Sequence, residues 1–287
     1  MNKCSLLGND TTEPVYIPSF PGARKEHAEK FGPYTMPPVY VGETRGYLID
    51  GIYTRWVRGS GDVVVDISGM WANNYFHWVS EFLPKIQIAD DIYGDYQIIT
   101  KDVTAEFAKQ SLELLGFHQG GKITTGKVVT IAKIPSRRNG GRMSVQAVKW
   151  LRSQFLTNKR HERRRLYISR NANQDRHVAD EAALINGLGF EVVKPEMMTF
   201  REQVNLFSSA DVIMGPHGAG LVNMIWAEAA HVIEILGDMT NPCHFTMAIA
   251  CGHEYTPAYG KTSGRSIIIN RKELEKCLAL IGRGNNE

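Results

Sequence analysis

The sequence predicts an α/β fold with two domains, and three observations support this prediction. The chain has 287 residues, more than most single domains contain. Short apolar segments of strand length alternate with segments whose apolar residues recur at helical spacing, which is typical of a parallel sheet covered by helices. A glycine-rich turn, Gly215–Gly220, joins one such strand to one such helix. We therefore divide the chain into an extended arm (1–45), two α/β domains (46–158 and 159–270), and a C-terminal helix and tail (271–287).

The composition favours a soluble globular protein. Hydrophobic residues make up 43% of the chain and charged residues 22%, enough for a sizeable core. The net charge of +3 is slight and does not suggest a nucleic-acid partner. The four cysteines form no C-x-x-C pair, so neither a zinc knuckle nor a disulfide framework is indicated, and a reducing compartment fits best. Without a signal-peptide core or an apolar run long enough to span a membrane, we expect a cytoplasmic protein.

The N-terminal half begins with a proline-rich stretch. Residues 1–45 contain six of the 12 prolines, which predicts an arm with little regular structure. The domain that follows is expected to contain strands at 46–50, 63–68, 96–100 and 128–134, helices at 103–115 and 144–156, and a further helix capped by Asn73 or Asn74.

The helix after Asn74 carries a pair of side chains suited to acid–base chemistry. His77 and Glu81 are four residues apart, so they share one face of the helix, and this is not its apolar face. If the two domains close over a cleft, a general base is expected on this face. The alternatives are a structural histidine and a glutamate that pairs with Lys85. Pro84 is expected to kink or end the helix.

The C-terminal half repeats the alternation of strands and helices more regularly. Strands are expected at 165–169, 191–194, 212–214 and 232–236, and helices at 178–187, 199–209, 242–251 and 272–281. This pattern predicts a doubly wound domain, in which ligands bind at the carboxyl ends of the strands.

Three segments of this domain would meet at that edge. Arg170 and Arg176 follow the first strand, and arginine offers planar donors suited to phosphate oxygens. The Gly215–Gly220 turn precedes a helix whose first N–H groups can bind an anion, and its glycines allow positive φ or the close approach of a ligand. Glu234 lies inside an apolar strand, where a carboxylate needs a partner such as a ribose diol. Together these segments predict a nucleotide diphosphate site.

Two polar residues near the turn allow more than one interpretation. His217 is either a ligand contact or a turn residue held by a backbone hydrogen bond, and Asn223 either caps the helix or contacts the ligand. The spacing G-x-x-G-x-G after a later strand differs from the G-x-G-x-x-G that follows the first strand in dinucleotide-binding proteins, so a dehydrogenase is disfavoured. The chain also contains no Asp-x-Asp motif that could hold a metal ion at the predicted diphosphate site. We expect cationic residues to take the place of such a metal.

These motifs together resemble glycosyltransferase family 61, which is linked to capsular polysaccharide synthesis. The resemblance covers roughly residues 60–260 and rests on four blocks: Asn74–Trp78 with Glu81 and Pro84, Tyr167–Arg170, Gly215–Leu221 with Asn223, and Val232–Ile235. Family members often carry Asn-Glu in the helix after the second block, and here only Glu181 matches. The resemblance implies a GT-B architecture, with two Rossmann-like domains facing a cleft, the N-terminal one on the acceptor side and the C-terminal one binding the donor nucleotide. It also implies inverting transfer without a metal or other cofactor.

The leading hypothesis is a hexosyl- or pentosyltransferase that moves a sugar from a nucleotide-diphosphate sugar to a hydroxyl group of a glycan or polysaccharide acceptor. Uridine is expected as the donor base on the family resemblance alone. His77 would be the catalytic base, with Glu81 orienting it or acting as the base itself. The expected donor-binding residues are Arg170, Arg176, Gly215, His217, Gly218, Ala219, Gly220, Leu221, Asn223 and Glu234. The alternatives are another nucleotide-sugar enzyme, such as an epimerase or hydrolase, and a non-catalytic nucleotide-sugar-binding protein.

Overall fold

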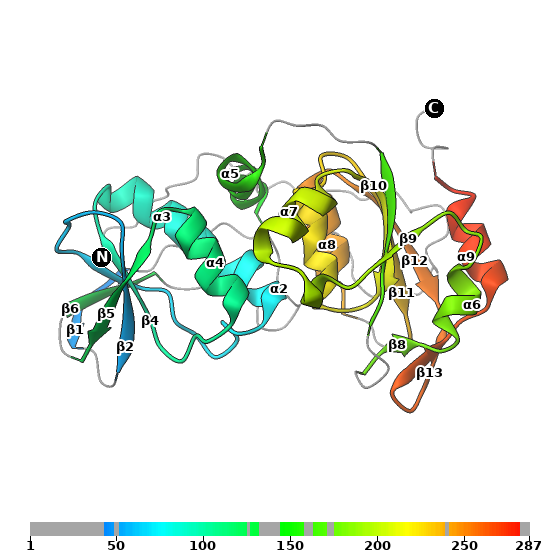
Figure 1. Ribbon diagram of the computed structural model, residues 1–287, viewed down its shortest axis with the longest axis horizontal. Helices are drawn as coiled ribbons and strands as arrows, with labels where there is room; N and C mark the ends of the chain where they lie inside the picture. Colours follow the sequence, from blue (N-terminus) through cyan, green and yellow to red (C-terminus); the bar gives the residue numbers. More distant parts are fainter. Residues whose placement is uncertain are drawn as a thin grey trace. The chain divides into compact units, whose positions relative to one another are not determined.

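The computed structural model describes residues 43–48, 52–124, 127–131, 144–157, 163–170, 175–238 and 241–281. These residues form two compact units, which we call unit 1 and unit 2 (Figure 1). Unit 1 runs to Phe155 and includes Thr199–Arg201, and unit 2 holds the other described residues from Leu156 onward. The predicted N-terminal arm lies outside the described residues except for its last three positions.

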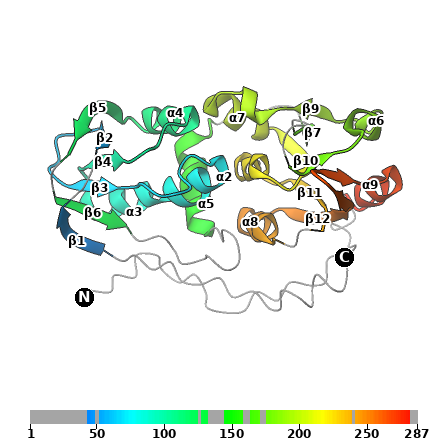
Figure 2. The ribbon, with the colours of Figure 1, turned by 90° about the horizontal axis from the view of Figure 1, so that it is seen from below.

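Unit 1 contains a mixed sheet of six strands. These are β1 (Glu43–Leu48), β2 (Tyr53–Val57), β3 (Val64–Asp66), β4 (Gln97–Thr100), β5 (His118–Ile123) and β6 (Lys127–Ile131). Their order across the sheet is β1-β6-β3-β4-β2-β5, which can be followed in Figure 2. The central strands β6, β3 and β4 are parallel, whereas β1, β2 and β5 pair antiparallel with their neighbours. The parallel arrangement expected of a Rossmann-like domain is therefore limited to the centre of this sheet.

The predicted helix around His77 is divided into three segments. The helices of unit 1 are α2 (Tyr75–His77), the π-helix η1 (Trp78–Phe82), α3 (Pro84–Tyr93), α4 (Glu106–Leu114) and α5 (Val145–Phe155). The side chain of Asn74 caps α2 by accepting the N–H groups of Phe76 and His77. Pro84 is the first residue of α3, where its missing N–H leaves no hydrogen bond unmade. The π-helix between them is a rare geometry that is often found at functional sites.

Unit 2 contains a sheet in which all strands are parallel. These are β7 (Arg164–Ile168), β9 (Glu191–Val193), β10 (Ala210–Pro216), β11 (His231–Leu236) and β12 (Glu254–Tyr259). Their order, β12-β11-β10-β7-β9, places the first strand of the unit beside the third (Figure 2). This is a doubly wound topology, as predicted. The order reverses between β7 and β10, and such switch points are where these folds bind ligands.

Helices cover both faces of the unit 2 sheet. The helical segments of the C-terminal half are α6 (Glu181–Ile185), η2 (Pro195–Met197), α7 (Phe200–Phe207), the 3-10 helix η3 (Ala219–Trp226), α8 (Cys243–Cys251) and α9 (Arg271–Leu278). Figures 1 and 2 show α6 and α9 on one face and α7 and α8 on the other. A small sheet is formed by β8 (His177–Val178), β13 (Lys261–Ser263) and β14 (Ser266–Ile268).

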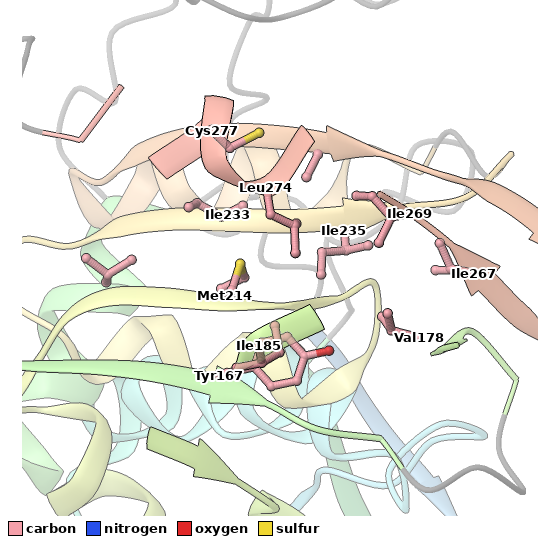
Figure 3. Close-up of a cluster of buried hydrophobic side chains, with 12 residues drawn as sticks. Tyr167, Val178, Ile185, Met214, Ile233, Ile235, Ile267, Ile269, Leu274 and Cys277 are labelled. Carbon is pink, nitrogen blue, oxygen red and sulfur yellow. The ribbon is translucent and has the colours of Figure 1, made fainter. Parts of the chain in front are cut away.

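The face covered by α6 and α9 carries an apolar core. Met214, Ile233 and Ile235 from the strands pack in one cluster with Leu274 from α9 (Figure 3). Because successive side chains of a strand point to opposite faces, Glu234 points away from this core, to the face that α8 covers. The alternation of side chains along β11 thus explains why the Glu234 carboxylate points away from the apolar core.

Some elements differ from the sequence predictions. The strands β2, β5, β8, β12, β13 and β14 were not predicted, and Val178 of β8 was expected to begin a helix. The segment after Gly218 is a 3-10 helix rather than an α-helix. The predicted C-terminal helix exists as α9, which packs into the core of unit 2. Within the described part of the chain, no helix is both long and apolar enough to cross a bilayer.

Candidate functional site

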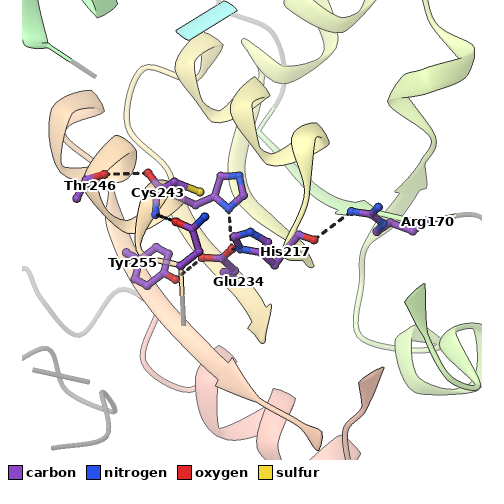
Figure 4. A network of polar contacts seen from close by, with 8 residues as sticks. Arg170, His217, Glu234, Cys243, Thr246 and Tyr255 are labelled. Carbon is purple, nitrogen blue, oxygen red and sulfur yellow. Dashed lines mark hydrogen bonds and ion pairs between the residues drawn. The ribbon is translucent and has the colours of Figure 1, made fainter. Parts of the chain in front are cut away.

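Two loops meet at the switch point of the unit 2 sheet. Arg170 follows β7, and its Nη1 atom donates a hydrogen bond to the carbonyl oxygen of His217, 3.0 Å away, at the end of β10 (Figure 4). A Cβ atom on Gly218 would overlap this guanidinium group, so the close approach requires glycine at position 218. The structure therefore brings together the arginine and the glycine turn, which are 48 positions apart in sequence.

The glycines of the turn serve close packing rather than an unusual backbone conformation. None of the three lies in the left-handed region, and Gly218, with φ 173°, is extended. A Cβ atom on Gly215 would lie 2.9 Å from Cβ of Ile168, and one on Gly220 would lie 3.0 Å from Cγ2 of the same residue. Glycine at these positions lets the end of β10 and the start of η3 pack directly against β7. The sequence allowed for positive φ and for the close approach of a ligand, and the structure shows the close approach of Ile168 and Arg170.

Glu181 fixes the end of β7 immediately before Arg170. Its Oε1 atom accepts a hydrogen bond of 2.6 Å from the Ser169 hydroxyl, and its Oε2 atom accepts one of 3.1 Å from the Tyr167 hydroxyl. Burial and the neighbouring Glu181 charge raise the pKa of Tyr167, so its hydroxyl remains a donor. In the sequence, Glu181 matches a residue that family members often carry, but its position there suggests no role. The structure makes it the anchor of the strand end that carries Arg170.

Positive charge accumulates at this edge. Burial and, next, the positive charge of Arg176 lower the pKa of Arg170. The charge of Arg176 also acts on Cys243 and His244, which shows that it lies near the same end of the sheet. Because the charge of Arg176 disfavours the charged form of Arg170, a bound anion would stabilise Arg170 by offsetting that repulsion. The arrangement suits a phosphate or diphosphate group.

A buried network lies behind the turn. Glu234 is 0% exposed, and its Oε1 atom lies 2.5 Å from Nδ1 of His217 and 2.6 Å from Nδ1 of His244. Its Oε2 atom accepts a hydrogen bond from the hydroxyl of Tyr255 (Figure 4). Burial alone would raise the pKa of Glu234, but the two histidines outweigh it and hold the pKa below its ordinary value. An ionised carboxylate only accepts, so both Nδ1 atoms carry hydrogen.

The network changes the interpretation of Glu234. The sequence suggested a ribose diol as its partner, whereas the structure pairs it with His217, His244 and Tyr255 and leaves no part of it exposed. Its contact with the site runs through His217, whose backbone N–H also donates to Ile235 O at 3.0 Å. Glu234 therefore positions the turn instead of lining it. The sequence could not find this role, because His244 and Tyr255 lie on other elements.

Two other predicted donor-binding residues also support the turn from inside. Leu221 and Asn223 are both 0% exposed. The Asn223 amide donates to Oε1 of Gln203 at 2.9 Å and to the Gly220 carbonyl at 3.1 Å, and it accepts the indole N–H of Trp226 at 3.1 Å. These hydrogen bonds hold η3 in place. Asn223 thus acts within η3 and does not cap it, because the N-cap position is Gly218.

The candidate base lies in unit 1, at the junction of α2 and η1. Nδ1 of His77 lies 3.1 Å from Oε1 of Glu81, and their side chains are 27% and 9% exposed. Glu81 thus faces His77, as the four-residue spacing predicts. The Lys85 ammonium group lies over the ring of Phe82, 5.1 Å from its centroid. His77 and Glu81 therefore form a partly exposed pair on an irregular helical turn.

Comparison with known families identifies the protein class. The family model described as Glycosyltransferase 61 matches residues 75–233, more than half of the chain. The chain belongs to this family. No match was found among curated proteins.

Membership of family 61 makes the chain a glycosyltransferase, an enzyme with a sugar donor and an acceptor. The matched segment begins two residues before His77 and contains Arg170 and His217. It ends one residue before Glu234, so the family match covers the polar edge of unit 2 and the candidate base of unit 1.

One group of side chains in this family 61 member has the composition of a metal site. Ligand atoms of His217, Cys243 and His244 lie within 4.8 Å of one another in the described residues. Glu234 already accepts from Nδ1 of both histidines. Burial and then the charge of Glu234 raise the pKa of the Cys243 thiol, which keeps it protonated. In the described residues the two histidines of this trio are held by their hydrogen bonds to Glu234.

Proposed function

We propose that this family 61 member is an inverting, metal-independent transferase. It moves a sugar from a nucleotide-diphosphate sugar, with a uridine nucleotide as the first candidate, to a hydroxyl group of a glycan or polysaccharide. The observation that carries the proposal is the meeting of Arg170 and the Gly218 turn at the switch point of a doubly wound sheet. Donors for an anion converge there from two loops.

The donor diphosphate would be held by Arg170, Arg176 and the first N–H groups of η3. The arginines supply charge-assisted hydrogen bonds, and the first N–H groups of a helix have no acceptor within it. As the bond between the sugar and the diphosphate breaks, negative charge develops on the leaving phosphate. Fixed cationic donors stabilise that charge most strongly, which is commonly the largest catalytic contribution.

The acceptor would be activated by unit 1. His77 takes the proton of the acceptor hydroxyl, and the oxygen attacks the anomeric carbon as the nucleoside diphosphate leaves with the electron pair. A single displacement of this kind inverts the anomeric centre. Glu81, 3.1 Å from Nδ1 of His77, orients the imidazole and stabilises its protonated form. In this scheme no step requires a metal.

The architecture and location in the proposal rest on the resemblance and on composition. We propose the GT-B type, in which a donor-binding domain and an acceptor domain are separate. The doubly wound sheet of unit 2 supports the donor half of this assignment. We also propose a cytoplasmic location, on the cysteine pattern and composition of the chain. A crystal structure with a bound nucleoside diphosphate would test the architecture.

The proposal is tested first by nucleotide binding. Isothermal calorimetry with UDP, GDP, CDP and their sugars should detect one diphosphate class. Arg170→Ala should weaken that binding by about 100-fold, because it removes a partly buried charged donor. Arg163→Ala is the matched control, since the Arg163 side chain is 85% exposed and pairs only with Asp211 among the contacts described for it. Equal affinities for the wild type and Arg170→Ala would remove Arg170 from the donor site.

Transfer is tested next with the donor that binds. NMR of the product should show the opposite anomeric configuration to the donor, and a chelator should leave the rate unchanged. Turnover of donor without any acceptor would instead indicate a hydrolase or an epimerase. Binding without turnover for every acceptor would indicate a nucleotide-sugar-binding protein.

A further inference from the structure

Trp71 is a large aromatic side chain left half-exposed beside the candidate base. It is 54% exposed, and its ring stacks on the His77 ring with centroids 5.7 Å apart and planes inclined by 26°. Indole rings are usually well buried because their apolar area is large. The exposed part of the Trp71 indole therefore lies beside His77, which forms the candidate acid–base pair with Glu81.

The exposure of Trp71 does not come from a loose loop. The backbone closes a turn on each side, with Ala72 N donating to Gly69 O at 3.0 Å and Asn74 N donating to Trp71 O at 2.9 Å. The side chain of Asn73 ties the same loop to another segment. It accepts the N–H groups of residues 104 and 105 at 2.8 and 3.0 Å, and it donates to the carbonyl of residue 102 at 2.6 Å. The backbone that carries the indole is thus held in place by hydrogen bonds within the protein.

The His77 ring is fixed from several sides. Trp71 stacks on it, the Phe76 ring meets it edge-on at 5.3 Å, and Glu81 lies 3.1 Å from its Nδ1 atom. A substrate that packs on the exposed part of the indole is therefore close to both the imidazole and the carboxylate. The Trp71 indole is flat and apolar, and the neighbouring side chains of His77 and Glu81 offer hydrogen-bonding groups.

We propose that Trp71 is the platform for the acceptor sugar. A pyranose ring has an apolar face of C–H groups that packs on the electron-rich face of an aromatic ring, and its rim of hydroxyl groups suits His77 and Glu81. The site accordingly takes a pyranose residue, with one of its hydroxyl groups at His77. This inference rests on the proposed function, because it assigns the acceptor that His77 would activate.

Binding is measured with a panel of methyl pyranosides of glucose, galactose, mannose and xylose. Ligand-observed NMR on the full chain should show binding of at least one of them. Trp71→Ala should weaken it about tenfold, the effect expected from losing a few tens of Å² of buried apolar contact. Trp71→Phe, which keeps an aromatic face, should retain most of the affinity. Met70→Ala is the matched control, because Met70 is 83% exposed and lies next in sequence.

Kinetics separate a platform from a residue that only orients His77. With a transferred pyranoside, Trp71→Ala should raise the acceptor KM about tenfold and leave the donor KM unchanged. A fall in kcat at unchanged acceptor KM would overturn the platform and leave Trp71 as a positioning residue. Wild-type protein that binds no pyranoside, or a Trp71→Ala variant that binds as well as wild type, would also overturn it. If nucleotide binding and inverting transfer persist in those cases, the proposed function stands and only the platform fails.

Discussion

Two glutamate–histidine pairs in this chain have the same chemistry in opposite environments. In unit 2, Nδ1 of His217 lies 2.5 Å from Glu234, and the two side chains are 6% and 0% exposed. In unit 1, Nδ1 of His77 lies 3.1 Å from Glu81, and the side chains are 27% and 9% exposed. The buried pair is completed by further hydrogen bonds, whereas the other leaves its imidazole accessible. Burial, not residue type, separates a pair that supports a turn from a pair that can meet a substrate.

The reason is the energetic penalty for an unsatisfied buried charge. A carboxylate with no exposure must have all its oxygens engaged, and Glu234 achieves this with three side chains. A histidine that still contacts solvent keeps one nitrogen for a substrate proton. We therefore expect the partly exposed pair, His77 and Glu81, to affect mainly kcat. The buried pair, His217 and Glu234, should affect mainly the free energy of unfolding.

The largest effect is expected from removing the candidate base. His77→Ala should lower kcat by about 1,000-fold, the scale of general-base catalysis, because no other group then takes the acceptor proton. Its free energy of unfolding should change by less than about 1 kcal/mol, since the pair is partly exposed. Initial rates at saturating donor and urea denaturation measure the two quantities.

The same experiment decides between the two members of the exposed pair. Glu81→Gln keeps the shape of the side chain but removes its charge, and we expect a loss of only about tenfold in kcat if Glu81 orients His77. A larger loss for Glu81→Gln than for His77→Ala would make Glu81 the base and His77 its helper. Both variants should bind the nucleotide as wild type does.

The next largest effect is expected on stability, from the buried pair. Glu234→Ala should lower the free energy of unfolding by about 3 kcal/mol, because it leaves two buried imidazole N–H groups without their acceptor. Glu191→Ala, which removes an exposed partner of Arg164, is the control and should cost less than about 1 kcal/mol. Urea denaturation of both variants provides the measurement. Equal losses would show that the network behind the turn is no more important than a surface pair.

The smallest effect is expected from a change of one pH unit. The pKa of Glu234 is below its ordinary value of 4.5, because the histidines outweigh burial, and burial lowers the pKa of His244 below 6.5 against the opposing charge of Glu234. Both groups bind protons less readily in the folded protein than in the unfolded chain, so acid favours unfolding. Stability should fall as the pH drops below 6.5, by at most about 1.4 kcal/mol per pH unit for each group.

The control for the pH effect is a protein without the carboxylate. In Glu234→Gln, the part of the fall that occurs below pH 4.5 should shrink, because the charge that protons neutralise is gone. Denaturation curves between pH 4 and pH 8 measure this. A wild-type stability that rises on acidification would contradict the assignment of an ionised Glu234.

Much of the fold of unit 2 could be predicted from its apolar runs. The runs that form β7, β10 and β11 are apolar enough to indicate buried parallel strands, and the helices between them repeat regularly. Of the strands that escaped prediction, β5, β12 and β13 lie at sheet edges, whereas β2 lies between β4 and β5. β12 is an edge strand and carries Pro257, which an interior strand would not accommodate, and β5 contains two adjacent glycines. Proline and glycine thus weaken the local strand pattern of β12 and β5.

The candidate site was predicted in part, and the reason lies in distance along the chain. The types of residue that bind a diphosphate, arginine and a glycine turn at strand ends, are visible in the sequence, and the order of strands brings Arg170 to Gly218. The partners of Glu234 were not visible, because they come from α8 and β12. Neither was the anchoring of the β7 end by Glu181.

By itself the sequence determined the α/β class, the doubly wound second half, and the small set of polar residues from which a transferase site could be made. The tertiary structure alone decided which of the two glutamates is enclosed and which remains near solvent. It also decided that the glycines serve close packing against Ile168 and Arg170. The physical reason is that burial and hydrogen-bond satisfaction depend on neighbours from distant segments, whereas strand and helix patterns are written in consecutive residues.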